Sequence, residues 1–321
     1  MKSFAAFALA GVASATASVD AVRDTIAQHE FKFMNYIAQW GKSYASIEEY
    51  EHRFANFIKK EKWITEVNSD LRNTYTVGHN DFSDMTEEEY NQRLGYDPTM
   101  WEEDQSPIYG QVSNYPTSID WRSQGAVGVV KNQGGCGDCW IFSGTAGLES
   151  YWKIKHGSLP NLAEQQCLDC CTQGNKCNGG VAGFVYNYAI TNYVMKTSDY
   201  PYTHTPGTCK YKGSGLVKIQ SYSRLAAGSL ATHKTRLASG PVSVSLDAGG
   251  AFGSYTGGII NSNCGTNINH AVLAVGYTSD YYIIKNSWGS NWGESGFARI
   301  KITGDGDGMC GIQKQSVGID Y

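Results

Sequence analysis

Three segments far apart in the sequence carry side chains that together could cleave a peptide bond by nucleophilic attack. The first contains Gln133 and Cys139, the second His270 and the third Asn286. A thiol attacks a carbonyl as thiolate, and an adjacent imidazole can take its proton and remain beside it as imidazolium. An amide can orient the imidazole, and amide N–H groups can stabilise the oxyanion. These four residues therefore predict a nucleophile, its base, an orienting group and an oxyanion donor.

The elements around these residues predict an α+β enzyme of two subdomains. Cys139 begins a helix predicted over 139–156 and ended by Gly157, and a helix N-terminus favours an anion such as a thiolate. Short Gly or polar turns separate the strands predicted downstream, which cover 242–246, 271–277, 281–285 and 297–302. Helices come first and strands later, which is typical of α+β proteins.

The front of the chain has a different composition from the remainder. Residues 18–113 lack cysteine, and helices are predicted over 20–40 and 46–71, with an exposed polar linker over 98–115. They carry 9 Lys/Arg and 18 Asp/Glu, a net charge of −9, whereas residues 114–321 carry 16 and 12, a net charge of +4. The opposite charges suggest that the acidic segment docks on the basic one, although solvated acidic helix faces would give the same composition.

Residues 1–17 have the pattern of a secretory signal peptide. Lys2 precedes an apolar run over 4–12, and small residues at 15–17 form a cleavage site. The run is too short to span a bilayer and no later stretch is long enough, so we expect no membrane span. Maturation would then take place where disulfides persist. The net charge of −4 gives no reason to expect a nucleic-acid partner.

Taken together, these motifs resemble the papain family of cysteine proteases, nearest its cathepsin L-like group. The resemblance rests on the stretches QGGCGDCW at 133–140, NHAV at 269–272 and KNSWG at 285–289. It implies a papain-like fold with a helical left subdomain and a β-barrel-like right one. It also implies that Trp288 shields the bond between His270 and Asn286, and that Trp292 forms a wall on the leaving-group side.

The resemblance also implies where a substrate would bind. Gly179 and Gly180 would pair their backbone with an extended peptide. The pocket for the second residue upstream of the cut would be lined by Val181, Ala182, Ser245, Ile268 and Gln315. Apolar walls and an amide floor suggest hydrophobic side chains, with tolerance for a polar tip. No insertion like the occluding loop of dipeptide-trimming relatives follows Cys177, which favours an endopeptidase.

Residues 18–113 resemble a helical inhibitory propeptide, with the boundary within five residues of 113, ahead of a mature domain at 114–321. Its two motifs are matched by Glu49, Arg53, Phe57, Ile64 and Asn68, with Lys60 in place of Asn, and by Gly78, Asn80, Phe82 and Asp84. The resemblance implies an autoinhibited precursor whose propeptide runs through the cleft in reverse. It would be activated by proteolysis at acid pH, with Asp84 as a sensor.

The same resemblance implies the partners and the location. We expect peptide and protein substrates, the chain's own propeptide and cystatin-like inhibitors as partners of a monomer. No cofactor or metal is expected. The location would be the secretory pathway, ending in a lysosome or digestive vacuole or outside the cell.

The nine cysteines are divided between catalysis and disulfides. By resemblance, the bridges are Cys136–Cys177, Cys170–Cys209 and Cys264–Cys310. Cys139 is left for catalysis, with Cys167 and Cys171 four residues apart on a predicted helix. Helical Cβ atoms at that spacing lie about 5–6 Å apart, whereas a disulfide needs roughly 3.5–4.5 Å. We therefore expect Cys167 and Cys171 to be buried free thiols.

Two residues beside the nucleophile depart from the family pattern. Asp138 stands where the family has mostly Ser, and Ile141 where it usually has Ala. A carboxylate next to a thiolate should raise the pKa of the thiol, unless the carboxylate points to solvent and is screened.

Three alternatives follow from these features. Asp138 motivates a catalytically inactive papain-fold protein that binds or stores. Residues 18–113 could make the chain an inhibitor, which would not need the Cys–His–Asn set. A zinc site is a third alternative, although its flanks lack finger spacing. Its ligands would come from Cys136, Cys139, Cys170, Cys171 and Cys177.

Overall fold

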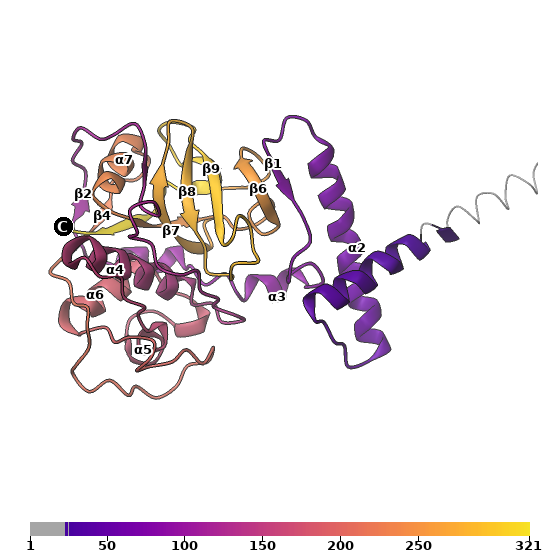
Figure 1. Cartoon of the computed structure of the whole chain (residues 1–321), viewed down its shortest axis with the longest axis horizontal. Helices are drawn as coiled ribbons and strands as arrows, with labels where there is room; N and C mark the ends of the chain where they lie inside the picture. Colours follow the sequence, from indigo (N-terminus) through magenta and orange to yellow (C-terminus); the bar gives the residue numbers. More distant parts are fainter. Residues whose placement is uncertain (1–22, 25) are drawn as a thin grey trace, which may run out of the picture. The chain divides into compact units, whose positions relative to one another are not determined.

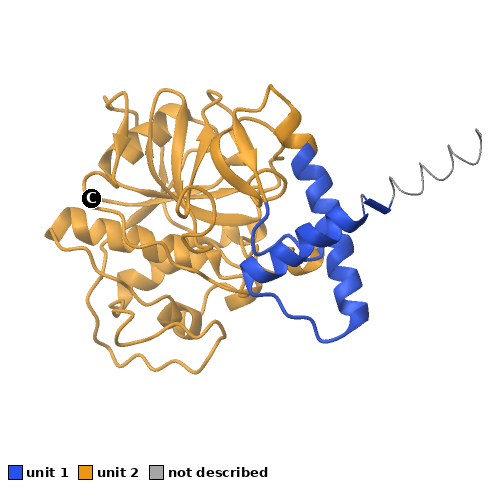
Figure 2. Ribbon diagram, turned by 45° about the vertical axis from the view of Figure 1, so that its right-hand side comes forward, with its two compact units in different colours: residues 1–65, 79–86 blue, residues 66–78, 87–321 orange. Residues whose placement is uncertain are grey.

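The computed structural model describes residues 23–24 and 26–321, which form two compact units. Figure 2 shows these units in two colours. The described part of unit 1 comprises residues 23–24, 26–65 and 79–86, and unit 2 comprises residues 66–78 and 87–321. The predicted signal peptide at residues 1–17 lies outside the described residues.

Unit 1 is built from helices around an aromatic core. Residues 26–40 are helical, and α2 spans Ile47–Ser69, close to the ranges that the periodicity predicts. The predicted residues 20–22 and 25 lie outside the described range. The rings of Phe33, Tyr36 and Phe57 form the centre of the core, since all three are buried and in contact.

Most of the predicted propeptide-motif residues are buried or hydrogen-bonded within their own unit. Arg53 pairs with Glu49 one turn earlier and donates to the carbonyl of Asp84 at 3.3 Å. Phe57, Ile64 and Phe82 are buried, and Asn80 accepts from the Phe82 N–H at 3.0 Å. In unit 2, Asn68 exchanges two hydrogen bonds with the backbone of Val77, and Gly78 N donates to Ser254 O.

The sheet of unit 2 has the mixed α+β surroundings that the resemblance implies, and it is open rather than closed into a barrel. Its strands run in the order β1-β6-β9-β8-β7-β5-β10-β4-β2, with β3 paired to β7, and the two ends do not meet. Figure 1 shows β7, β8 and β9 side by side. The bounds are β1 Tyr75–Val77, β2 Ile108–Tyr109, β3 Ile119–Asp120, β4 Tyr222–Leu225, β5 Val242–Leu246, β6 Tyr255–Ile260, β7 His270–Tyr277, β8 Tyr281–Lys285, β9 Phe297–Lys301 and β10 Ser316–Ile319.

The long buried helix of unit 2 is α4, Cys139–His156, and helices α5 and α6 pack against it. Its C-cap, Gly157, has φ +78°, which an L side chain rarely adopts, and this confirms the predicted stop. Ser143 donates to the carbonyl of Val272 at 2.7 Å and so fixes α4 against β7. The other helices are α3 Glu87–Asn91, α5 Glu164–Cys170, α6 Ala182–Thr191 and α7 Leu230–Ser239, with 3-10 turns η1 Pro98–Glu103, η2 Lys176–Asn178 and η3 Met309–Gly311.

Four disulfides hold unit 2. Three are the expected pairs, Cys136–Cys177, Cys170–Cys209 and Cys264–Cys310. The fourth joins Cys167 to Cys171, so the expectation of two free thiols is wrong. Helix α5 ends at Cys170, and Cys171 is an extended cap residue with φ −66° and ψ 124°. The spacing of a continuous helix therefore does not apply, and the two Cα atoms lie 4.8 Å apart.

The segment predicted as an exposed linker is only partly one. Residues 98–103 form η1, and β2 pairs in parallel with β4. Asp104 between them is buried and accepts from Tyr222 at 3.0 Å. The continuously exposed stretch begins at Gly110 and continues to residue 118. The accessible part of the segment is therefore shorter than predicted. In the described part of the chain, no helix has the length and apolar character needed to cross a membrane.

Candidate active site

The thiol of Cys139 lies at the first residue of α4, next to the first residues of β7. Its side chain is fully buried, and it is the one free cysteine in the described part. The backbone N–H of Ala271 donates to Sγ at 3.4 Å, which places the thiol beside the residue that follows His270. The predicted helix start and the predicted strand thus bring together two residues that are 131 positions apart in the sequence.

His270 and Asn286 form the expected pair. Strand β8 runs antiparallel to β7, so the residue after the end of β8 returns to the start of β7. The Nε2 atom of His270 lies 2.8 Å from Oδ1 of Asn286. Trp288 stacks on the imidazole, with ring centroids 4.6 Å apart and an interplanar angle of 29°, and Trp292 packs edge-on against Trp288. His270 and Asn286 are both buried, and the Trp288 indole covers one face of the imidazole.

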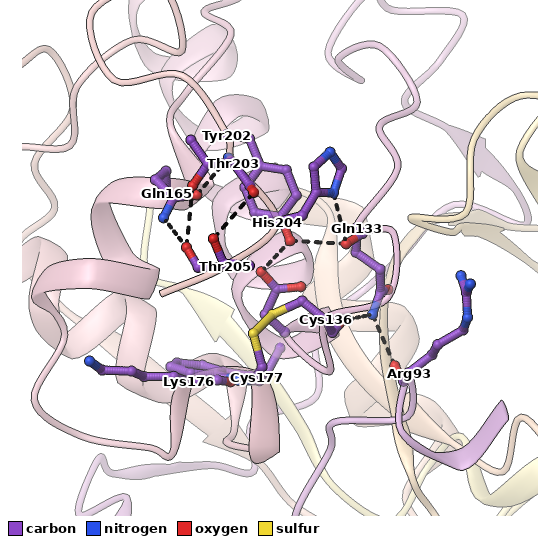
Figure 3. Close-up of a disulfide and its surroundings, with 12 residues drawn as sticks. Arg93, Gln133, Cys136, Gln165, Lys176, Cys177, Tyr202, Thr203, His204 and Thr205 are labelled. Atoms are coloured by element: carbon purple, nitrogen blue, oxygen red, sulfur yellow. Dashed lines mark hydrogen bonds between the residues drawn. A yellow bond between two sulfur atoms is a disulfide. The ribbon is translucent and has the colours of Figure 1, made fainter. Parts of the chain in front are cut away.

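Gln133 is fixed at both ends of its side chain. Its Oε1 accepts from the Ser287 hydroxyl at 2.7 Å, and its Nε2 donates to the carbonyl of Cys136 at 2.8 Å. The same Nε2 donates to the carbonyl of Arg93 at 2.9 Å (Figure 3). One amide N–H of Gln133 thus points at a carbonyl oxygen supplied by residues 90–97, which is the chemistry expected of an oxyanion donor.

Residues 95–97 pair with the predicted substrate-binding backbone. Gly180 N donates to Gly95 O at 3.0 Å, and Asp97 N donates to Gly180 O at 3.2 Å. The resulting bridge between Tyr96 and Gly180 is parallel. Gly180 packs so closely on Trp140 that a Cβ would lie 2.6 Å from the indole. Gly179, with φ +130°, precedes it in a conformation that favours glycine.

The predicted pocket residues lie in the same region as one further side chain, that of Tyr96. Its ring is buried in the same hydrophobic cluster as Val181, Ala182 and Ile268. Its hydroxyl donates to Oε1 of Gln315 at 2.7 Å. Ser245 is also buried and donates to the carbonyl of Gln315 at 2.9 Å. Sequence reasoning did not single out Tyr96, because nothing in its local pattern distinguishes it.

Burial keeps both members of the Cys–His pair uncharged in this structure. It raises the pKa of the Cys139 thiol to about 12, although N–H donors from Ala271 and Gly95 act in the opposite direction. It also lowers the pKa of His270 to about 4, against a smaller opposing effect of the Asn286 bond. Gly95 lies so close that a Cβ there would be 1.6 Å from Gly137 O. The site is therefore assembled but covered by residues 93–96.

Asp138 is buried, so the alternative in which its carboxylate points to solvent and is screened is wrong. Its side chain has no exposed surface, and burial raises the pKa of its carboxyl well above the usual range. Oδ2 lies 2.8 Å from the hydroxyl of Tyr202, a residue that sequence reasoning missed because it lies 64 positions away in a loop. The zinc alternative also fails, because four of its five cysteines are in disulfides.

Both parts of the chain match known families. Residues 115–319 match the papain family cysteine protease, and residues 33–90 match the cathepsin propeptide inhibitor domain. The cysteine protease XCP2 of Arabidopsis thaliana is 39% identical over 300 residues, which is 88% of this chain and 84% of that protein. Chymopapain of Carica papaya is 40% identical over 298 residues, with the same two coverages.

Solved precursors have the same fold. The recombinant stem bromelain precursor superposes with a TM-score of 0.84 at 34% identity, covering 92% of this chain and 99% of that one. The digestive procathepsin L2 proteinase from Tenebrio molitor larval midgut has a TM-score of 0.84 at 32% identity, covering 91% and 100%.

Proposed function

The chain belongs to the papain family of cysteine proteases, and we propose that its Cys139 and His270 are the nucleophile and base of a cysteine endopeptidase. The observation that carries this assignment is the convergence of the ends of α4, β7 and β8 on one point. There the Ala271 N–H contacts the Cys139 thiol and Asn286 holds the imidazole.

The reaction follows from these contacts. His270 takes the thiol proton, and the thiolate attacks the carbonyl carbon of the scissile bond, whose π electrons move to oxygen. Gln133 Nε2 and the backbone N–H of Cys139 donate to this oxyanion. The C–N bond then breaks, and the leaving amine receives the proton from His270. Water, deprotonated by His270, hydrolyses the thioester and restores the thiol. Asn286 keeps the ring oriented in each step.

Residues 90–97 block this site. Their backbone runs through it in the direction opposite to that of a substrate. Tyr90 packs edge-on against Trp288, on the proposed leaving-group side, and its hydroxyl donates to Ala248 O. Arg93 supplies the carbonyl that Gln133 binds, and Tyr96 fills the proposed upstream pocket. The chain therefore runs from the leaving-group side to the upstream side, the reverse of a substrate. The parallel bridge to Gly180 supports the same direction.

The pocket around Tyr96 supports a preference for a large apolar or aromatic residue at the second position upstream of the cut. Its walls are the apolar side chains of Val181, Ala182 and Ile268, and its polar end is Gln315. A tyrosine satisfies both parts, since its ring is buried and its hydroxyl reaches the amide. Gly179 and Gly180 would hold the peptide backbone on the adjacent edge.

We further propose activation by proteolysis at acid pH. Papain-family proteases made with a propeptide are typically enzymes of the secretory pathway, and four disulfides fit an oxidising compartment. An acidic lysosome or digestive vacuole, or an acidic exterior, would favour release. The exposed residues 110–118 are the accessible place for a cut, which puts the boundary between propeptide and mature domain near residue 113.

The experiment is to incubate the purified precursor at acid and at neutral pH. At acid pH the chain should shorten by a cut within residues 107–118 and gain peptidase activity that a thiol-directed epoxide abolishes by labelling Cys139. The matched Cys139→Ser precursor should stay intact, because a serine hydroxyl beside this histidine is far harder to ionise. Equal processing by Cys139→Ser, or labelling of another residue with loss of activity, would refute the assignment.

A further inference from the structure

The side chain of Asp138 does not cap the helix that it precedes. It occupies the N-cap position of α4, where an Asp side chain normally accepts from the first N–H groups of the helix. Here it makes no capping bond. Oδ2 instead lies 2.8 Å from the hydroxyl of Tyr202, and Oδ1 is buried without a hydrogen-bond partner among the described residues.

The Tyr202 hydroxyl lies between two acceptors. It is 2.8 Å from Asp138 Oδ2 and 3.0 Å from the carbonyl oxygen of Gln133. Figure 3 shows Tyr202 beside Gln133, with His204 on the same side. A hydroxyl carries one proton, so it cannot donate fully to both oxygens. If Asp138 is a carboxylic acid, its own proton goes to the Tyr202 oxygen, and the Tyr202 proton is free for Gln133. Tyr202 then makes both contacts with a proton in each, and within this group only Oδ1 of Asp138 stays unpaired among the described residues.

A carboxylate at this position would be poorly compensated. Burial removes an ion from water at a large cost, and the dipole at a helix N-terminus offsets only part of that cost. Glu164 adds a second negative group nearby. Lys131, which could have offset these charges, is already bonded to Glu149 and Glu164. The balance of these terms favours the neutral acid.

We infer that Asp138 is a positioning residue, a carboxylic acid that donates to Tyr202 so that Tyr202 can donate to the carbonyl of Gln133. This inference rests on the proposed role of Gln133 as oxyanion donor. The relay holds one side of the Gln133 backbone, while Gln133 N donates to Ser287 O at 2.9 Å on the other side. With both sides fixed, Nε2 of Gln133 is aimed before the substrate arrives, which is the condition for stabilising charge in the transition state.

The relay also explains how an acidic residue is tolerated beside the nucleophile. A neutral Asp138 exerts no charge repulsion on the Cys139 thiolate. Among the described residues, the titratable groups that act on Asp138 are Cys139 on α4, Glu164 on α5 and Tyr202 on the loop at 201–205. The Nδ1 atom of His204 is 3.4 Å from the Gln133 carbonyl, so it supports the same oxygen at the limit of hydrogen-bond distance.

Infrared difference spectroscopy tests the protonation state directly. The full chain with Cys139→Ser, which prevents processing, is compared at pH 7 with the same chain carrying Asp138→Asn. A carboxylic C=O band should be present in the first and lost in the second, and Tyr202→Phe should shift it. A difference spectrum with only carboxylate bands at Asp138 would overturn the inference. This measurement needs no activity, so it stands even if Cys139 proves not to be the nucleophile.

Kinetics of the enzyme released from the full-chain precursor test the positioning role. Tyr202→Phe and Asp138→Leu should each lower kcat roughly 10-fold, with KM within about 2-fold, because a misaimed oxyanion donor matters chiefly in the transition state. Asp138→Asn keeps a donor to Tyr202 and should restore most of kcat. Tyr200→Phe is the matched control, because Tyr200 lies two residues before Tyr202 and its hydroxyl donates to Asp169 on α5 at 2.7 Å.

Two kinetic results would contradict the relay. One is a loss in Asp138→Asn as large as that in Asp138→Leu. The other is an acid limb of the kcat/KM profile that moves to lower pH in Asp138→Asn, because this would mean that a negative charge had been removed from beside the thiol. An unchanged acid limb is the expected result.

Discussion

The hydroxyl of Tyr96 donates to Oε1 of Gln315 at 2.7 Å, inside the pocket that the sequence predicts for substrate. The inhibitory segment thus occupies the pocket with a side chain that uses both its apolar walls and its polar end. Substrates should reveal the same complementarity.

The enzyme should therefore prefer Tyr to Phe at the second position upstream of the cut. A net hydrogen bond of about 0.5–1.5 kcal/mol corresponds to a ratio of kcat/KM between roughly 2 and 12. Gln315→Leu should reverse this preference, since the buried hydroxyl loses its acceptor. Matched fluorogenic peptides measure the ratio, and Gln124→Leu, an exposed glutamine, is the control. A Tyr-to-Phe ratio unaffected by Gln315→Leu would show that the Gln315 amide does not bind the tyrosine hydroxyl of the substrate.

Gly95→Ala should weaken inhibition by the propeptide strongly. A Cβ at residue 95 would lie 1.6 Å from the carbonyl oxygen of Gly137, so the backbone must move away from Cys139. We expect the inhibition constant of a peptide of residues 18–113 to rise by at least about 10-fold, corresponding to a loss of roughly 1.4 kcal/mol. Gly110→Ala is the control, because its Cβ meets no atom within 4 Å. Equal inhibition by both variants would mean that residues 93–96 do not lie on the thiol in solution.

The Cys167–Cys171 bridge predicts one titratable thiol in the denatured, unreduced chain. Two free thiols at these positions would give three. Replacing both residues by Ser should destabilise the protein by about 2 kcal/mol, the chain-entropy value for so short a loop. Removing Cys136–Cys177, with a sequence separation of 41, should cost about 4 kcal/mol. Thiol titration and denaturant unfolding measure the two effects, and a count of three thiols would exclude the fourth bridge.

The elements that position the catalytic residues could be predicted because their signals are local. The start of α4 at Cys139 and its end at Gly157 follow from a helix pattern and a glycine cap, and the ranges of β5 and β8 agree with the predicted strands. The pairing of His270 with Asn286 follows from resemblance, and the structure supplies its geometry.

What the sequence did not predict depends on contacts between distant residues. Tyr202 meets Asp138 across 64 positions, and no spacing rule indicates that meeting. Asp104 lies in a polar stretch typical of a linker, but its burial is decided by Tyr222 in β4. The error at Cys171 arose because a continuous helix was assumed where the chain leaves it one residue earlier.

Asp84→Asn should allow processing at higher pH. Within unit 1 its carboxylate accepts from Tyr36 at 2.8 Å and Tyr44 at 2.9 Å and pairs with Lys42 at 3.2 Å. Removing the charge weakens these bonds and leaves the fold of unit 1 about 1–3 kcal/mol less stable. Asp81→Asn is the control, because Asp81 pairs with the same Lys42 but is 47% exposed. Identical processing midpoints in wild type and Asp84→Asn would assign the pH sensing to other groups.

His270 should make release of the propeptide pH-dependent through its own proton. Burial lowers the pKa of His270 from its usual 6.5 to about 4 in the covered site. When residues 90–97 leave, the imidazole can be protonated near its usual pKa or above it. The covered state therefore has its full stability above pH 6.5 and loses stability as pH falls toward 4. The loss is up to 1.36 kcal/mol per pH unit, or about 3 kcal/mol in all.

Attraction between the net charge of −9 on residues 18–113 and of +4 on residues 114–321 predicts that the propeptide loses affinity in a different pH range. Carboxylates have reference pKa values of roughly 3.9–4.3, so their neutralisation matters mainly below pH 5, and salt screens the attraction between exposed charges. Binding of residues 18–113 to the Cys139→Ser enzyme separates the two causes when it is measured at pH 7, 5.5 and 4.5 and at low and high salt. If His270 dominates, affinity falls already between pH 6.5 and 5.5 at both salt concentrations, and His270→Gln, which cannot be protonated, removes that fall. If the fall persists in His270→Gln and disappears at high salt, the surface carboxylates are responsible and the His270 mechanism is wrong.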